Sequence, residues 1–369
     1  MNLFATPSPE KVVHHFDKYF SKVQAKNPTR PLQIRVYSQK LGLDYIFPPN
    51  SENQPYHIAS IGKVFTAVLV QIFAQRGEFS LQDKILRFFT PADLEKLFVF
   101  HDTDYARDVT IEHLLGHTSG IADYFEGIAD ALEGSKKPRT TFIDEVLTDP
   151  SHHWNPQELV EYTRKYQKAV GVPGKKFNYS DTGYILLGLI IEKVTGIAFD
   201  QNLTNEIFAP LAMHDSHLMF YSEPKNTPRK DIAKIWMNGV EVSSFESLTC
   251  DWSGGGIIST TADLLKFNKA LRSEKLIPAS TLETMDSCNY RFQPGIYYGL
   301  GMMEIRFKEF FFMLGRLPKV KGHIGILSTH MFYDPAKDAH VIINLGDNTR
   351  MVASFQALIE IENALQRMK

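Results

Sequence analysis

The sequence predicts an α+β protein in which one antiparallel sheet is built from both ends of the chain and a helical domain is inserted between the two parts. Alternating apolar and polar residues, typical of strands, occur at residues 33–47 and return at residues 297–345. Between these runs the pattern is mainly helical, with several marked helix starts. We therefore expect a discontinuous sheet domain, residues 1–80 and 287–369, and a mainly helical domain, residues 81–286.

Composition is that of an ordinary globular protein and disfavours several kinds of partner. The chain has 369 residues, of which 43% are hydrophobic and 22% charged. A net charge of -2 with well-mixed signs argues against nucleic acid. No apolar run reaches the length of a membrane span, and the N-terminus lacks a basic region followed by an apolar run. We expect no secretory signal, no membrane partner and a cytoplasmic location.

The N-terminal elements follow from local signals. Ser8-Pro9-Glu10 is a helix start, and the helix that follows has an apolar face suited to packing on a sheet. Two alternating runs at 33–37 and 44–47, separated by a turn-prone segment, predict a β-hairpin. Residues 64–74 are apolar on almost every side, so this helix is expected to be buried, with Gly77 closing it.

The remaining elements have equally local signals. Capping patterns mark helix starts near residues 155 and 260, and two further helices have long apolar faces. The two cysteines, Cys250 and Cys288, are expected to be buried thiols rather than a disulfide or metal ligands. The expected later segments are a helix at 184–195, strands within 297–307, 321–332 and 340–345, and a terminal helix at 351–368.

The start of the buried helix carries a hydroxyl and an amine three residues apart, at Ser60 and Lys63. Residues at i and i+3 share one face of a helix, so these groups are close enough to exchange a proton. Burial favours the neutral form of a lysine, which can act as a base. We interpret Ser60 as a nucleophile and Lys63 as its activator. The structural alternative is that Ser60 caps the helix and Lys63 extends to solvent.

Three further patterns are expected where helices and strands meet. Tyr179-Ser180-Asp181 is a polar loop that presents a phenol and a carboxylate. His323-Ile324-Gly325 lies in a predicted strand, where the glycine allows another backbone or a ligand to come close. The third pattern, Asp251-Trp252-Ser253-Gly254-Gly255-Gly256, places three successive glycines before a capped helix. Each pattern is weak evidence when taken alone.

In this order and at these separations, the patterns resemble those of the serine β-lactamase and penicillin-binding protein superfamily. The closer resemblance is to its branch of class C β-lactamases, DD-peptidases and family VIII-type esterases, with Tyr-x-Asn as second motif and sometimes His-x-Gly as third. Residues 114–120 and 254–260 also resemble that branch, and the resemblance extends from about residue 34 to 345. It implies a β-lactamase-like fold, an active site between the two domains, and neither a metal nor an organic cofactor.

The resemblance also implies roles for individual residues. Ser60 would be the acylated nucleophile and Lys63 its proton acceptor. Tyr179 would relay the proton to the leaving group and later help water attack, with a phenol pKa lowered by nearby cations. The backbone N–H groups of Ser60 and Ile326 would form the oxyanion hole.

Three positions are assigned to substrate binding by the same resemblance, and two of them depart from its pattern. Gly325 would let its strand approach the nucleophile, and His323 would line the cleft opposite Tyr179. Asp181 stands where relatives have an asparagine that donates to the substrate, and an ionised carboxylate cannot donate. His323 stands where a lysine would supply a fixed positive charge. Both departures weaken the case for β-lactams or peptidoglycan stems.

We therefore predict a serine hydrolase that acts through a Ser60 acyl-enzyme on a small-molecule ester, amide or short peptide. One alternative is a D-Ala-D-Ala carboxypeptidase or β-lactamase. Another is a catalytically silent binding protein, favoured if Asp181 holds Lys63 as an ammonium. A zinc hydrolase using His113 and His117 is a third, but no third ligand lies near them in the sequence. Oligomeric state is not predicted.

Overall fold

A computed structural model describes residues 7–127, 141–225 and 231–368. The first six residues, on which the expectation of no secretory signal mainly rests, lie outside the described residues. The central element is an eight-stranded antiparallel sheet in the order β10-β11-β12-β13-β14-β15-β1-β2. Its strands are β1 Gln33–Ser38, β2 Leu43–Phe47, β10 Tyr290–Gln293, β11 Ile296–Tyr298, β12 Met303–Ile305, β13 Val320–Gly325, β14 Thr329–Asp334 and β15 Ala339–Asn344.

The two ends of the chain meet at β1, as predicted. Val36 of β1 pairs with Val341 of β15 on one side and with Tyr45 of β2 on the other. The N-terminal hairpin therefore extends the sheet formed by the C-terminal strands. The expected strand at 321–332 is two strands, because residues 326–328 form a turn in which Ser328 has a φ of 59°.

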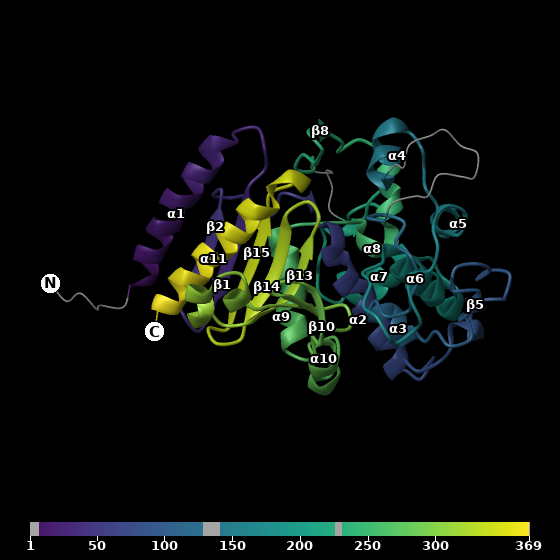
Figure 1. The fold of residues 1–369 in the computed structure, drawn as a ribbon. Helices are drawn as coiled ribbons and strands as arrows, with labels where there is room; N and C mark the ends of the chain where they lie inside the picture. Colours follow the sequence, from purple (N-terminus) through teal and green to yellow (C-terminus); the bar gives the residue numbers. More distant parts are fainter. Residues whose placement is uncertain (1–6, 128–140, 226–230, 369) are drawn as a thin grey trace.

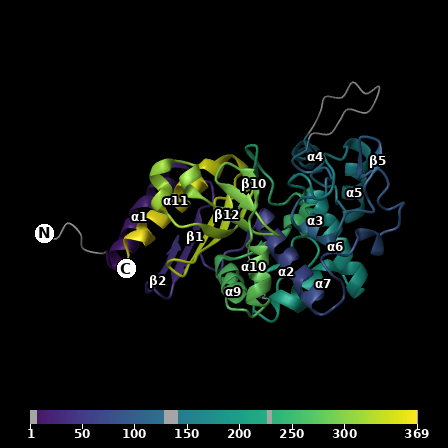
Figure 2. The same ribbon diagram turned by 60° about the horizontal axis from the view of Figure 1, so that its bottom comes forward.

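Helices cover both faces of the sheet. Helix α1, Pro9–Lys26, and helix α11, Met351–Arg367, lie side by side on one face (Figure 1), and His15 contacts Glu360 across them at 2.6 Å. Helix α9, Thr261–Arg272, lies on the opposite face from α11 (Figure 2), with Phe267 stacked on Phe65 of α2 at 3.7 Å. One apolar core fills the space under α1 and α11, and a second surrounds α2.

Two nearly all-apolar helices form the centre of the helical part. Helix α2, Gly62–Gln75, is buried along most of its length and begins after a 3-10 turn, η1, at Ala59–Ile61. Helix α6, Asp181–Thr195, is capped by the Ser180 side chain and ends on Gly196. The other helices are α3 Ile111–Leu115, α4 Phe142–Thr148, α5 Pro156–Tyr166, α7 Phe199–Leu203, α8 Trp252–Gly255 and α10 Ala279–Met285.

Several short elements were not predicted, because two or three residues carry no periodic signal. The short strands are β3 Tyr56–His57, β4 Val99–Phe100, β5 Thr103–Asp104, β6 His217–Leu218, β7 Trp236–Met237, β8 Val240–Glu241 and β9 Ile257–Ser259. The remaining turns of helix are η2 Ile85–Arg87, η3 Thr204–Phe208, η4 Glu246–Asp251, η5 Phe307–Glu309, η6 Phe312–Arg316 and η7 Asn348–Arg350.

The division into two domains stays a prediction, but the packing of α9 bears on its boundary. Helix α9 contacts strands β1, β14 and β15, and Asn268 donates to the Phe332 carbonyl at 3.3 Å. Residues 261–272 would therefore belong with the sheet rather than with the helical part. Cys250 and Cys288 are free and buried, which confirms that expectation.

A search for membrane-spanning helices covered the described ranges. No single helix there is both long and apolar enough to cross a bilayer, although α6 and the segment Phe199–Phe208, bent by 80°, meet the length and composition criteria as a pair.

A buried carboxyl group on α11 makes the stability of the fold depend on pH. Glu362 is fully buried, and burial together with Asp334 raises its pKa well above its usual value of 4.5. The folded protein thus holds a proton that the unfolded chain releases. The contribution of the Glu362 carboxyl to the free energy of unfolding is full below pH 4.5. It is lost as the pH rises toward the pKa that this group has in the folded protein.

We predict that Glu362→Gln becomes progressively more stable than wild type as the pH rises from 5 to 8, by up to about 1.4 kcal/mol per pH unit. Urea unfolding at each pH measures the difference. The exposed Glu283→Gln is the control and should show a constant difference. A constant difference for Glu362→Gln as well would contradict this assignment.

Candidate active site

Ser60 lies in the 3-10 turn η1, which several contacts hold in an unusual conformation. Ala59, just before the nucleophile, is buried with a φ of 50°, in the left-handed region. Its N–H donates to His57 Nδ1 at 3.1 Å. The neighbouring Ile58 carbonyl accepts from Thr329 Oγ1 of β14 at 2.9 Å. Such local strain persists only where surrounding groups enforce it, which is common at active sites.

Glycines let two other segments of backbone come very close to this turn. A Cβ atom on Gly255 of α8 would lie 2.9 Å from the Ala59 carbonyl carbon. A Cβ on Gly62 would lie 2.9 Å from Gly255 Cα, and one on Gly325 of β13 would lie 2.8 Å from Ala59 Cβ. The glycine run at 254–256 therefore allows α8 to pack on the nucleophile turn. Gly325 does the same for β13 from another side.

Lys63 is completely buried and has three polar neighbours. Its Nζ donates to the Gly254 carbonyl at 2.8 Å and to Ser60 Oγ at 3.4 Å, and it forms an ion pair with Asp181. The contact with Ser60 is the one expected from the i, i+3 spacing. The alternative in which Lys63 extends to solvent is wrong, because its side chain has no exposed surface.

The three neighbours of Lys63 suit both of its protonation states. Gly254 and an ionised Asp181 can only accept, so they use two N–H groups in either state. The third hydrogen-bonding position of Lys63 Nζ faces Ser60 Oγ. At this position an ammonium donates a hydrogen bond to the hydroxyl, and an amine accepts one from it. A proton can therefore pass between Ser60 and Lys63 without a rearrangement of the other two contacts.

More carboxyl groups surround Lys63 than the sequence indicated. The Asp181 N–H donates to buried Asp123 at 2.9 Å, and Asp251 lies 3.4 Å from His57 Nε2. Burial, and then the charge of Asp181, raise the pKa of Asp123 to about 8 and that of Asp251 to about 7. Asp123 was missed because it is a single acid outside the predicted motifs, and Asp251 stands at the start of the glycine-rich pattern but was given no role.

Tyr179 lies beside the nucleophile, but its acidity differs from the expectation. Its ring centroid is 5.0 Å from Lys63 Nζ. Burial, and then the charge of Asp181, raise the pKa of Tyr179 well above its usual value and outweigh the lowering effect of a hydrogen bond with Ser60. The prediction of a lowered pKa is therefore wrong. The main physical reason is that burial disfavours the phenolate, and the second is that Lys63 is accompanied by the carboxylate of Asp181.

His323 is buried beneath the site rather than exposed along a cleft. Its Nδ1–H donates to the Ile324 carbonyl at 2.6 Å, and its Nε2 accepts from the Tyr298 hydroxyl at 3.2 Å. Burial, helped by the charge of Lys63, lowers the pKa of His323 to about 3, so the ring is neutral at physiological pH. In this arrangement it offers a substrate neither a charge nor a free donor.

His117 braces the loop before α6. Its Nδ1 accepts from the Ser180 N–H at 3.1 Å, and its carbonyl accepts from the Asn178 N–H at 2.8 Å. His113 Nδ1 accepts from the Thr110 N–H at 3.2 Å. Within the described ranges, no group of three or more His, Cys, Asp or Glu side chains could hold a metal ion.

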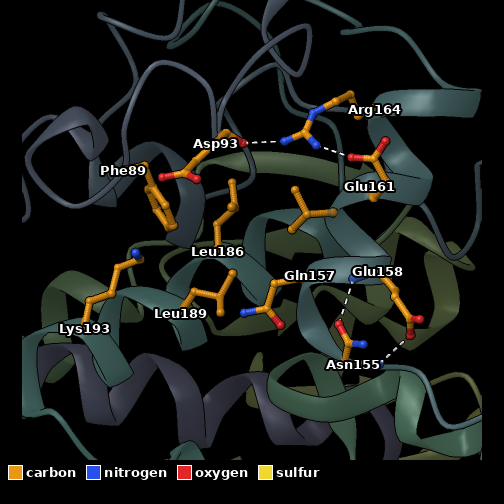
Figure 3. Close-up of a pocket in the computed structure, with 11 residues that line it drawn as sticks. Phe89, Asp93, Asn155, Gln157, Glu158, Glu161, Arg164, Leu186, Leu189 and Lys193 are labelled. Atoms are coloured by element: carbon orange, nitrogen blue, oxygen red, sulfur yellow. Dashed lines mark hydrogen bonds and ion pairs between the residues drawn. The ribbon is translucent and has the colours of Figure 1, made fainter.

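Among the pockets in the described part of the chain, one borders the site at Tyr179. It has a volume of about 510 Å³ and is lined by side chains of both charges, including Asp123, Glu126, Lys168 and Arg291. Another pocket, of about 460 Å³, lies over α5 and α6 (Figure 3) and has no lining residue in common with the site. Ser60 and Lys63 line neither pocket, so Tyr179 is the link between the site and the first pocket.

The sequence is similar to those of curated penicillin-binding proteins. Penicillin-binding protein 4 of Amycolatopsis lactamdurans is 27% identical over 232 residues, which are 61% of this chain and 53% of that protein. The chain spans about half the length of the curated relatives it matches.

Solved structures share the fold over nearly the whole chain. The D-amino acid amidase of Ochrobactrum anthropi SV3 has a TM-score of 0.75 at 21% identity, covering 96% of this chain and 99% of that one. A D-stereospecific amidohydrolase from Streptomyces sp. has a TM-score of 0.71 at 23% identity, covering 91% and 94%. A family model described as Beta-lactamase matches residues 38–358. The chain therefore belongs to the Beta-lactamase family.

Proposed function

We propose that the protein is a serine hydrolase that forms and hydrolyses an acyl-enzyme on Ser60, with esters or amides of small carboxylic acids as substrates. The observation that carries this proposal is the environment of Lys63. Two of its hydrogen-bonding directions are taken by Asp181 and Gly254, and the third faces Ser60 Oγ at 3.4 Å. The fold shared with two amidases supports amides within the substrate range.

Acylation begins with Lys63 as an amine whose two N–H groups are held by the Gly254 carbonyl and the ionised Asp181. The lone pair of the amine then takes the proton of Ser60 as Oγ attacks the substrate carbonyl. The negative charge that develops on the carbonyl oxygen is met by the backbone N–H groups of Ser60 and Ile326, at the place where β13 approaches the nucleophile turn.

Tyr179 acts as the acid for the leaving group. Its raised pKa means that the phenol keeps its proton at neutral pH, so it can donate to a departing amine or alkoxide. Lys63 then returns the proton taken from Ser60 to the Tyr179 oxygen, which restores the phenol. Hydrolysis of the acyl-enzyme follows the same path in reverse, with water in place of the leaving group.

A D-Ala-D-Ala carboxypeptidase or β-lactamase is the second candidate. Neutral His323 supplies no cation for a substrate carboxylate, which counts against it. However, Lys168 and Arg291 line the pocket beside Tyr179 and could bind a carboxylate there. The penicillin-binding proteins among the relatives also favour this candidate.

The first prediction concerns the nucleophile. Brief incubation with a fluorophosphonate should give one covalent adduct on the wild-type protein by intact mass, and none on Ser60→Ala. The exposed Ser273→Ala is the matched control and should label like wild type. A folded wild-type protein that takes no adduct would favour the silent binding protein instead.

The second prediction concerns the acid. Tyr179→Phe should lower kcat for amides and alkyl esters by about 10²- to 10⁴-fold, because their leaving groups need a proton. The loss should be much smaller for p-nitrophenyl acetate, whose leaving group departs as an anion. Steady-state kinetics on both kinds of substrate measure the contrast, with exposed Tyr290→Phe as control. Equal losses on both kinds of substrate would remove Tyr179 from this role.

A further inference from the structure

A short segment between β12 and β13 exposes large apolar side chains next to one another. No residue of the 3-10 turn η6 is buried. Phe311, Phe312 and Met313 are 48%, 74% and 62% exposed. Contiguous exposed apolar side chains on a folded protein commonly mark an interaction site. The Phe312 surface, as we name it, consists of Lys308, Phe311, Phe312, Met313, Arg316 and Lys319.

The segment is anchored on both sides of these exposed residues. Phe307 before them and Leu317 after them are buried. The Phe310 ring packs edge-on against Phe355 of α11 at 5.4 Å, and Arg316 donates to Asn363 Oδ1 at 2.8 Å. The apolar side chains are therefore held outward by a fixed backbone.

Positive charge surrounds the apolar centre. Residues 304–319 contain four basic and two acidic residues, a net charge of +2 in a chain whose total is -2. Glu304 contacts Arg306 at 2.7 Å and Lys319 at 3.2 Å, and the Glu309 carboxylate accepts from the Tyr297 hydroxyl at 3.2 Å. Lys308, Arg316 and Lys319 are all exposed at the edge of the surface.

We propose that the Phe312 surface docks on the anionic face of a lipid bilayer. Phe311, Phe312 and Met313 would enter the interface between headgroups and acyl chains, while the basic side chains face lipid phosphates. A second copy of the chain fits less well, because a two-fold contact would place the same cations against each other. The expectation of no membrane partner was based on membrane-spanning segments and secretory signals. A segment that binds the surface of a bilayer needs neither.

The surface lies away from the nucleophile. The surface ends just before Val320, the first residue of β13. Gly325, which lies beside the turn of Ser60, is five residue steps farther along this extended strand, a distance of about 17 Å. Docking would leave the pocket beside Tyr179 open. Variants of the Phe312 surface should therefore hydrolyse soluble substrates normally.

The test is co-sedimentation with vesicles of equal parts phosphatidylglycerol and phosphatidylcholine, compared with phosphatidylcholine alone. Wild type should bind the anionic vesicles, and added salt should weaken binding. Phe312→Ser/Met313→Ser should lower the association constant at least about tenfold, since burying one large apolar side chain changes an equilibrium by roughly that factor. The double variant Ile197→Ser/Val240→Ser, at exposed apolar positions elsewhere, is the matched control.

Several outcomes would overturn the proposal. These are no binding by wild type to anionic vesicles, binding by Phe312→Ser/Met313→Ser equal to that of wild type, or equal binding to both kinds of vesicle at all salt concentrations. Wild type that binds no vesicles but self-associates, with self-association abolished by Phe312→Ser/Met313→Ser, would show that the surface binds a second copy of the chain instead. An unchanged urea midpoint shows that each variant is folded.

Discussion

The site depends on one constraint, which is that a lysine with no exposed surface must have hydrogen-bond partners inside the protein. Lys63 is fully buried at the start of an apolar helix, where an unpaired ammonium would be very costly. Asp181 and Gly254 meet that need from two different segments. The start of α6 and the turn of α8 must therefore converge on the start of α2. Ser60 is the remaining hydrogen-bonding neighbour of Lys63, and in the proposed mechanism these two groups exchange a proton.

The same convergence explains features that look unrelated in the sequence. The glycine run at 254–256 is needed because α8 must approach the nucleophile turn within contact distance, and Gly325 allows β13 to do so as well. Thr329 of β14 adds a hydrogen bond to that turn. The sheet formed by the chain ends thus supplies two strands that contact the turn of Ser60, while the helices supply Lys63 and Asp181.

Local sequence patterns predicted the longer helices and strands. The apolar helices, the hairpin at 33–47 and the contact of Ser60 with Lys63 all follow from spacing along the chain. The electrostatics of the site did not follow, because they depend on groups that only folding brings together. Asp123 gathers near Asp181 from 58 residues away, and the burial of His323 depends on Tyr298 of another strand.

The most direct test of this account is the steady-state kinetics of Asp181→Ala beside Asp181→Asn. Asp181→Ala removes the acceptor that fixes one N–H group of Lys63, so kcat/KM should fall by at least about 10²-fold, whereas Asp181→Asn keeps an acceptor oxygen and should lose less. The exposed Asp338→Ala is the control and should leave kcat/KM unchanged. A kcat/KM of Asp181→Ala equal to that of wild type would contradict the claim that Asp181 holds Lys63 in place for proton exchange with Ser60.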